Sequence, residues 1–342
     1  MDHRERFLSY FEGGRPDMLP LFLRDFTLGL DVLDCMSTDL FGERYDSELA
    51  SRSVLSFAKM TGQDAVIGCV HSPAFIVEQF GGVMRYTDWG VPTPLEHPFT
   101  SPSKLDSADT VLKGKALDAV EAYHITAKAG TDLAILGNIT GPLTKASVLM
   151  DMNILSLALN DDMDFVKDVI RIGTESTKSY LEMICDDIDA VFLASASDNP
   201  SLFGNEIVNS VSVPFLKEIV DFIHAMGKYA IYHPHGDYTD RTVMDPAVAT
   251  GIDCFQFGEN NDPRVIKEII GDRCIVMGGT DIIPTLYSGT PEEIRSETQR
   301  YLDVFNGSRY IFTCSCALQR DMPIQSIKEM CGLARSSQSA ER

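Results

Sequence analysis

The chain has 342 residues, 44% of them hydrophobic, and a formal net charge of −21 at pH 7. This size allows a substantial core, and α/β barrels of this length are commonly single domains. The negative charge argues against nucleic acid or an anionic membrane surface as a partner, because both repel an acidic protein. No stretch of about 20 apolar residues occurs, so we expect no membrane span.

The N-terminus and the cysteines predict a cytoplasmic protein. Residues 1–6 read MDHRER, and no apolar segment typical of a signal peptide follows them. Most of the eight cysteines lie in or beside apolar runs, where a thiol behaves as a small core residue. Reduced thiols without an export signal are typical of a cytoplasmic chain.

Eight short apolar runs along the chain predict strands. After an amphipathic helix expected at 4–11, these runs lie at 19–23, 65–70, 133–139, 190–194, 229–232, 254–257, 274–277 and 310–313. Segments with helical spacing separate the runs, for example those at 165–184, 213–226, 263–270 and 291–305. Alternating strands and helices indicate parallel pairing, and eight repeats predict an α/β fold of the (β/α)8 TIM barrel type. A doubly wound open sheet is the alternative.

The limits of this barrel follow from composition. We expect a single-domain barrel over residues 1–335 and a frayed polar tail at 336–342. The segment 80–107 is longer than a minimal barrel needs. Its glycines and prolines predict a structured loop or small hairpin that covers the barrel mouth.

Polar side chains follow the strand runs at their carboxyl ends, where α/β barrels carry their chemistry. They are Arg24, Asp25, Cys69, His71, Ser72, Asn138, Thr140, Ser195, Ser197, Asp198, His233, His235, Asp237, Glu259, Asn260, Asn261, Asp281, Cys314 and Cys316. Three of them are the candidate catalytic residues. We expect Asn138 to hydrogen-bond substrate, and Asp281 and Glu259 to orient a ligand histidine or bind substrate. Capping of a loop is the alternative for the two carboxylates.

The segment 229–237, YAIYHPHGD, is the strongest candidate for a metal site. His233 and His235 are two residues apart, so in an extended chain both imidazoles point the same way. Cys314 or Cys316, at the end of the eighth run, can add a thiolate, and we favour Cys316. Two imidazoles and a thiolate suit Zn²⁺ and leave a fourth position open. The alternative is a pair of hydrogen-bonded loop histidines and two incidental thiols.

Five motifs stand in order along nearly the whole chain. They are RERFLSYFEGGRPDMLP (4–20), GNITGPLTKAS (137–147), HPHG (233–236), GGTDIIPTLYSGTPEEIRSE (278–297) and CALQRDMPIQSIKEM (316–330). In this order the chain resembles the uroporphyrinogen decarboxylase superfamily. Within it, the chain is most similar to the branch of cobamide-dependent methyltransferases, such as methylcobamide:coenzyme M methyltransferases.

The resemblance implies that His233, His235 and Cys316 are zinc ligands. The middle ligand departs from the branch, which carries His-x-Cys-Gly where this chain has HPHG. Imidazole can replace thiolate, but two imidazoles and one thiolate leave about one positive charge on the site. A more positive ion acidifies a bound thiol or hydroxyl more strongly, and it makes a bound thiolate a poorer nucleophile.

The resemblance implies a zinc-dependent methyltransferase. It would move a methyl group between a corrinoid protein and a small thiol acceptor or an oxygen-bound methyl donor. No Asp-x-His-x-x-Gly corrinoid motif occurs in the chain, so we expect the corrinoid on a partner that docks transiently at the barrel mouth.

Two other functions are the alternatives. The first is a lyase like the decarboxylases themselves, although their arginine-rich turn is reduced here to Arg24 and their aspartate position falls on Ser72. The second is a non-catalytic accessory protein that binds a metal or a corrinoid.

Overall fold

A computed structural model describes residues 1–336 of the chain. The expected frayed tail at 336–342 therefore lies, except for its first residue, outside the described residues. None of the described helices is both long enough and apolar enough to cross a membrane.

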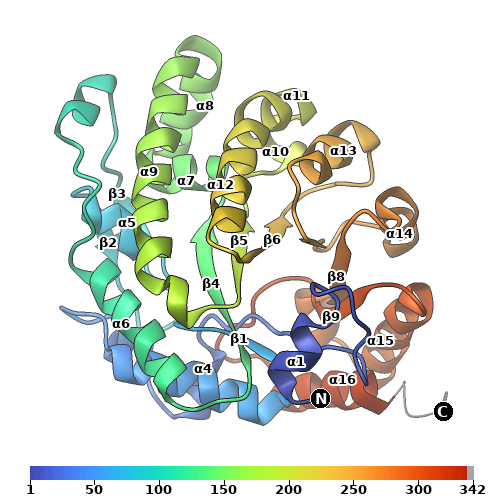
Figure 1. Ribbon diagram of the computed structural model, residues 1–342. Coiled ribbons are helices and arrows are strands. Elements are labelled where there is room, and N and C mark those ends of the chain that lie inside the picture. Colours follow the sequence, from blue (N-terminus) through green and yellow to red (C-terminus); the bar gives the residue numbers. More distant parts are fainter. Residues whose placement is uncertain (337–342) are drawn as a thin grey trace.

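Seven parallel strands form one curved sheet (Figure 1). They are β1 (Ala65–Ile67), β4 (Ala134–Thr140), β5 (Ala190–Ser195), β6 (Tyr229–Pro234), β7 (Cys254–Gln256), β8 (Ile275–Thr280) and β9 (Tyr310–Cys314). Each strand pairs with the next one along the chain, so the strand order never reverses within the described sheet. A doubly wound sheet requires such a reversal, and that alternative is therefore excluded.

The first apolar run, 19–23, occupies the eighth position of the barrel without forming a full strand. Single parallel bridges join Leu21 to Phe312 of β9 and Phe22 to Ala65 of β1. The N–H of Phe22 donates to the carbonyl of Phe312 at 3.0 Å. Pro20 has no N–H to contribute, which limits the pairing of this run. The predicted barrel is confirmed. Its eighth position is held by a segment that joins β9 and β1 through isolated bridges and not through a full strand.

Helices surround the sheet (Figure 1). In chain order they are α1 (His3–Leu8), α2 (Leu28–Val32), α3 (Ser37–Leu40), α4 (Ser47–Thr61), α5 (Ala74–Gln79), α6 (Lys115–Lys128), α7 (Pro142–Leu149), α8 (Met152–Asp161), α9 (Met163–Ile184), α10 (Pro200–Phe203), α11 (Asn205–Ile207), α12 (Val213–Ala225), α13 (Arg241–Ala249), α14 (Pro263–Ile270), α15 (Pro291–Phe305) and α16 (Ile324–Ser336). The bounds of α14 and α15 are those predicted, because a proline in the first turn marks where each helix begins.

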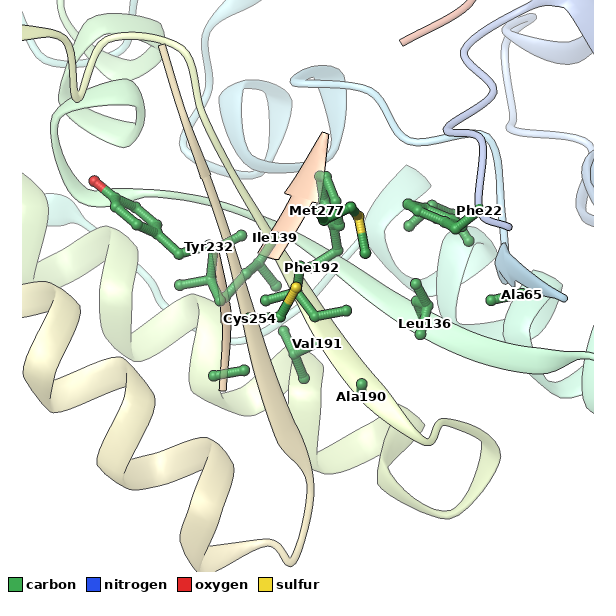
Figure 2. Packing of buried hydrophobic residues seen from close by; sticks show 14 of the residues in the cluster. Phe22, Ala65, Leu136, Ile139, Ala190, Val191, Phe192, Tyr232, Cys254 and Met277 are labelled. Atoms are coloured by element: carbon green, nitrogen blue, oxygen red, sulfur yellow. The ribbon is translucent and has the colours of Figure 1, made fainter. Parts of the chain in front are cut away.

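Buried apolar side chains on neighbouring strands pack against one another and form the core (Figure 2). Phe22 and Phe192 are both fully buried, and their ring centroids lie 5.7 Å apart. Burial of an aromatic side chain of this size contributes roughly 2–3 kcal/mol. This packing supports the polar side chains at the carboxyl ends of the strands.

A buried carboxylate holds the opposite, amino-terminal face together. Asp64 directly precedes β1, is fully buried, and accepts the backbone N–H of Leu21 at 2.8 Å. It also pairs with His3 and Arg6 of α1 and with Arg335 of α16, each at 2.8 Å. One side chain therefore links α1, α16 and the closing run.

The segment 80–107 contains the expected hairpin. Its strands β2 (Val83–Arg85) and β3 (Thr93–Glu96) pair antiparallel, and a 3-10 helix at Pro102–Ser107 follows. The N–H of Phe99 donates to the carbonyl of Leu149, so the segment packs against the end of α7. In the hairpin loop, the ring of Trp89 lies 5.0 Å from the Arg320 guanidinium, which follows β9.

Candidate metal centre at the carboxyl ends of the strands

Strand register determines which side chains face the barrel interior. Gly137 of β4 faces the helices, because a Cβ at this position would contact side chains of α9. Its neighbour Asn138 therefore faces the interior. Asn138 pairs with Phe192 of β5, and Ala194, two residues further, pairs with His233 of β6. Paired residues point to the same side, so His233 faces the interior as well.

His233, His235 and Cys316 converge, although β6 and β9 are three strands apart in the sheet. One ligand atom from each lies within 4.8 Å of the others. The Cys316 Sγ is 3.5 Å from the Nε2 of His235, and the two imidazole centroids are 5.0 Å apart. The i, i+2 spacing at the end of β6 produces the predicted convergence of the two rings.

The surroundings of His233 leave one ring nitrogen available. Its Nδ1 lies 3.4 Å from the carbonyl oxygen of Gln256. A carbonyl only accepts, so Nδ1 carries the proton and Nε2 keeps its lone pair. Among residues 1–336, this buried Nε2 has no hydrogen-bond partner. Gln256 is held in turn by its own amide, which donates to the carbonyl of Cys314 at 3.1 Å.

His235 and Cys316 form a polar pair in a buried setting. Burial alone would raise the pKa of Cys316, but the His235 hydrogen bond and the charge of Arg24 lower it below that of an ordinary thiol. Burial would likewise lower the pKa of His235, and the contact with Cys316 raises it instead. Burial, His235 and Arg24 together lower the pKa of His233 well below the ordinary value. The thiol thus gains thiolate character, and His233 stays neutral.

The structure separates the two candidate thiols. Cys314 is fully buried, and its Sγ donates to the carbonyl oxygen of Cys316 at 3.0 Å. Burial raises the pKa of Cys314, which keeps it a thiol. It is not part of the His233, His235 and Cys316 group.

This donor set fits the zinc ion that the sequence analysis expects. Two imidazole nitrogens and one thiolate sulfur are ligand types that zinc accepts, and three ligands leave a position open for substrate. The Nε2 of His233 is the ring nitrogen without a hydrogen-bond partner in residues 1–336, so it is the one available to a metal ion. His235, the middle one of the three expected ligands, reaches the same point as the other two side chains.

The three candidate catalytic residues lie outside this compact group. Asn138 is fully buried, and both its amide atoms lack a partner within the described chain. One oxygen each of Glu259 and Asp281 is also buried and unpaired in residues 1–336. Burial, with the nearby charges of Glu297 and Glu259, raises the pKa of Asp281 to about 6. Their expected roles stay predictions.

Other polar residues of the rim have structural roles. Asp25 accepts the N–H groups of Leu28 and Gly29 and so caps α2. Asp198 accepts the N–H and the hydroxyl of Thr144 at the start of α7. Sequence order places these carboxylates at the rim, but their hydrogen bonds direct them to helix termini.

Arg24 is a feature to which the sequence analysis gave no role. Its side chain is 5% exposed, and its guanidinium lies 4.4 Å from the Phe26 ring centroid and 5.2 Å from that of Phe192. In the part of the chain that the structure describes, the Arg24 side chain makes no hydrogen bond or ion pair. In the sequence, the position of Arg24 two residues after Phe22 is the one indication of this buried location, because side chains two residues apart in an extended chain lie on the same face.

The fold and the site define an α/β-barrel protein with a candidate metal centre at the carboxyl ends of its strands. The family model described as "Uroporphyrinogen decarboxylase (URO-D)" matches residues 2–337, and the chain belongs to this family. The resemblance drawn from the five sequence motifs is confirmed.

Relatives and a solved structure agree with this family. The chain is 24% identical over 255 residues to a methylcobamide:CoM methyltransferase, MtbA, of Methanosarcina mazei, covering 72% of this chain and 71% of the relative. It is 21% identical over 335 residues to the methylcobamide:CoM methyltransferase MtaA of Methanosarcina barkeri, covering 96% of each. A solved methyltransferase from Methanosarcina mazei superposes with a TM-score of 0.87 at 20% identity, covering 99% of this chain and 100% of that one. At this identity the superposition establishes the fold alone.

Proposed function

We propose that this protein is a zinc-dependent methyltransferase. It moves a methyl group between a corrinoid carried by a partner protein and either a small thiol acceptor or an oxygen-bound methyl donor. The observation that carries the proposal is the convergence of His233, His235 and Cys316 at the carboxyl ends of the barrel strands. The methylcobamide:CoM methyltransferases among the relatives support the corrinoid and the partner protein that carries it.

Bound zinc supplies a Lewis acid that acidifies a coordinated thiol or polarises an ether or hydroxyl oxygen. The protein's own residues position the reactants. Gln256 fixes the His233 ring so that its Nε2 stays a ligand, as hydrogen-bonded carbonyls do in zinc sites. The Asn138 amide is free to donate to and accept from the substrate.

Asp281 and Glu259 are the proposed proton-handling groups. Because its pKa is about 6, Asp281 changes protonation near neutral pH and can take the proton of an incoming thiol. Glu259 is close enough to raise the pKa of both His235 and Asp281 by its charge. We therefore propose both as catalytic residues beside Asn138.

The chemistry of the decarboxylases is a poorer fit to this chain. The position of their pyrrole-binding aspartate is held by Ser72, whose Oγ accepts the N–H of Ala74 at 3.1 Å and caps α5. Without that carboxylate, the site lacks the charge that would stabilise a cationic pyrrole.

Metal analysis of the untagged protein tests the proposal. We expect about one zinc per chain in the wild type, and loss of zinc in His235→Ala and in Cys316→Ala. His224→Ala and Cys185→Ala are matched controls, because both side chains lie away from the rim, and they should retain the metal. A wild-type protein without zinc would contradict the proposal.

Turnover then separates the two kinds of methyl substrate. Methylcob(III)alamin with 2-mercaptoethanesulfonate tests the thiol acceptor, and cob(I)alamin with methanol tests an oxygen-bound donor. Loss of the methylcobalamin absorbance, or its appearance, reports transfer in each direction. Zinc-loaded protein that is inactive in both assays, with a corrinoid partner supplied, would favour the non-catalytic accessory protein.

A further inference from the structure

The loop between β9 and α16 carries Cys316 and has no regular secondary structure of its own. Cys316 lies two residues beyond the end of β9. Two residues further, the N–H of Leu318 donates to the carbonyl of Arg24 at 2.8 Å, and its carbonyl accepts the N–H of Phe26 at 2.9 Å. The position of Cys316 therefore depends on how this loop is held against neighbouring segments.

Asp31 of α2 holds the part of the loop that follows Leu318. Its carboxylate pairs with the guanidinium of Arg320 at 2.6 Å and accepts the backbone N–H of Asp321 at 2.8 Å. The backbone N–H of Arg320 donates to the hydroxyl of the buried Thr27 at 3.2 Å. The side chains of Arg320 and Asp31 are only 10% and 18% exposed, so this ion pair is better shielded from water than a surface pair.

The guanidinium of Arg320 also contacts two other loops at the barrel mouth. It donates to the backbone carbonyl of Cys35, in the loop between α2 and α3, and it lies 5.0 Å from the ring centroid of Trp89 in the mouth hairpin. The hairpin and α3 are joined directly as well, because the N–H of Ser37 donates to the carbonyl of Asp88. An arginine can make these contacts together, since its planar group has several fixed donors and a face for stacking.

Backbone strain is concentrated next to these contacts. Among residues 1–336, three residues other than glycine have a left-handed backbone: Asp34, Asn260 and Asp321, with φ of 56°, 69° and 61°. Asp34 precedes Cys35, and Asp321 follows Arg320. Such a conformation costs roughly 1 kcal/mol and persists where the surroundings hold it, most often at functional sites.

We propose that Arg320 is a positioning residue for the candidate metal centre. Its ion pair with Asp31 fixes the loop that places Cys316 beside the two histidines, and its contacts with Cys35 and Trp89 extend this support to the mouth hairpin. This inference rests on the proposed function for the identity of the ion. The support of the Cys316 loop depends on the contacts of Arg320 alone, so the two can fail separately.

Zinc affinity tests the proposal. Competition with a chelator should show that Arg320→Met binds zinc about tenfold more weakly than the wild type, as expected when a residue that orients a ligand is lost. Arg295→Met is the matched control, because it removes contacts with Glu292 and Glu329 on the outer helices and should bind zinc as the wild type does. Unchanged zinc affinity in folded Arg320→Met protein would overturn the proposal.

A spectroscopic measurement separates positioning of Cys316 from a general loss of stability. When Co²⁺ replaces zinc, a thiolate ligand gives a charge-transfer absorbance that reports the bond to Cys316 directly. This band should lose intensity in Arg320→Met and be retained in Arg295→Met. An identical band in wild type and Arg320→Met would contradict the assigned role.

Asp31→Asn is the milder variant if Arg320→Met does not fold. It keeps an acceptor for the N–H of Asp321 but loses the charge that pairs with Arg320. We expect a smaller loss of zinc affinity in the same direction. Wild-type affinity in Asp31→Asn would also refute the role of the pair.

Hydrogen exchange of the zinc-free protein distinguishes the two proposals. Arg320→Met should speed amide exchange in the segments 315–322 and 86–91, whether or not the wild type binds zinc. If the wild type binds no zinc but this faster exchange occurs, Arg320 still supports the Cys316 loop and the methyltransferase proposal alone fails. If the wild type binds zinc and transfers methyl groups while Arg320→Met keeps the same zinc affinity, the positioning role alone is wrong.

Discussion

Replacement of Arg24 by methionine should stabilise the protein when no substrate is bound. Arg24 is 5% exposed, and no carboxylate in residues 1–336 pairs with it. Burial lowers the pKa of its guanidinium to about 10. One pKa unit corresponds to about 1.4 kcal/mol, so burial of the charge costs roughly 3 kcal/mol. Methionine fills a similar volume without this cost.

The expected net gain is smaller than this cost. The variant loses the contacts between the guanidinium and the rings of Phe26 and Phe192, which contribute about 1 kcal/mol. We therefore expect Arg24→Met to raise the free energy of unfolding by about 2 kcal/mol and the melting temperature by a few degrees. Arg52→Met, at an exposed site of α4, should change the free energy of unfolding by no more than a few tenths of a kcal/mol.

The pH dependence provides an independent check. Below pH 10 the guanidinium is charged in both the folded and the unfolded chain, so the penalty is constant between about pH 6 and 9. Above about pH 10 the folded state alone begins to lose the proton, and the advantage of the variant should shrink. Urea unfolding at pH 7 and 10 measures both. A variant less stable than the wild type at pH 7 would refute the reasoning, because it would mean that the charge of Arg24 is already compensated.

Three further changes have defined outcomes. Asp64→Ala should lower the free energy of unfolding by about 3–5 kcal/mol, because it leaves Arg6 and Arg335 without their buried partner. Urea unfolding measures this loss of stability, and a loss below about 1 kcal/mol would contradict the expectation. Asp281→Asn should stabilise the protein by about 1–2 kcal/mol at pH 8, after allowance for partial exposure, and hardly at all at pH 4. Because its pKa is raised to about 6, the Asp281 carboxyl is protonated in the folded state at pH 4. Equal stabilisation by Asp281→Asn at pH 4 and pH 8 would argue against this raised pKa. Zinc should protect Cys316 from iodoacetamide, and removal of zinc by a chelator should expose it, while fully buried Cys314 stays unmodified in both states. Peptide mass spectrometry measures modification at each cysteine. Modification of Cys314 alone would exclude the proposed ligand set.

Much of the barrel could be predicted because its strands are short apolar runs separated by amphipathic helices. The run at 19–23 marks the limit of that reasoning. Its apolar pattern is as clear as the others, but Pro20 cannot donate to a neighbouring strand. Only the isolated bridges of Leu21 and Phe22 show how it closes the barrel.

The candidate metal centre was predictable for a related reason. The i, i+2 spacing of His233 and His235 and the barrel rule on carboxyl ends suffice to bring them toward the end of β9. The choice between Cys314 and Cys316 depends on side-chain direction at the strand end, which sequence spacing does not determine.

Features built from contacts between distant segments could not be predicted. The lack of an ion-pair partner for Arg24 within residues 1–336 depends on where every carboxylate of the rim is directed. Asp25 and Asp198 have the composition of site residues, but helix N-termini hold them.

The links made by Asp64 have a consequence for synthesis of the chain. Its partners come from the first helix, from the run that closes the barrel, and from α16, the last described helix. Until α16 has emerged from the ribosome, the carboxylate lacks the Arg335 contact, and the amino-terminal face is incomplete. The strands of the seven-stranded sheet can pair in order as they are made, but closure of the ring is expected only after α16 has been made, when α1 and α16 meet on the Asp64 side chain.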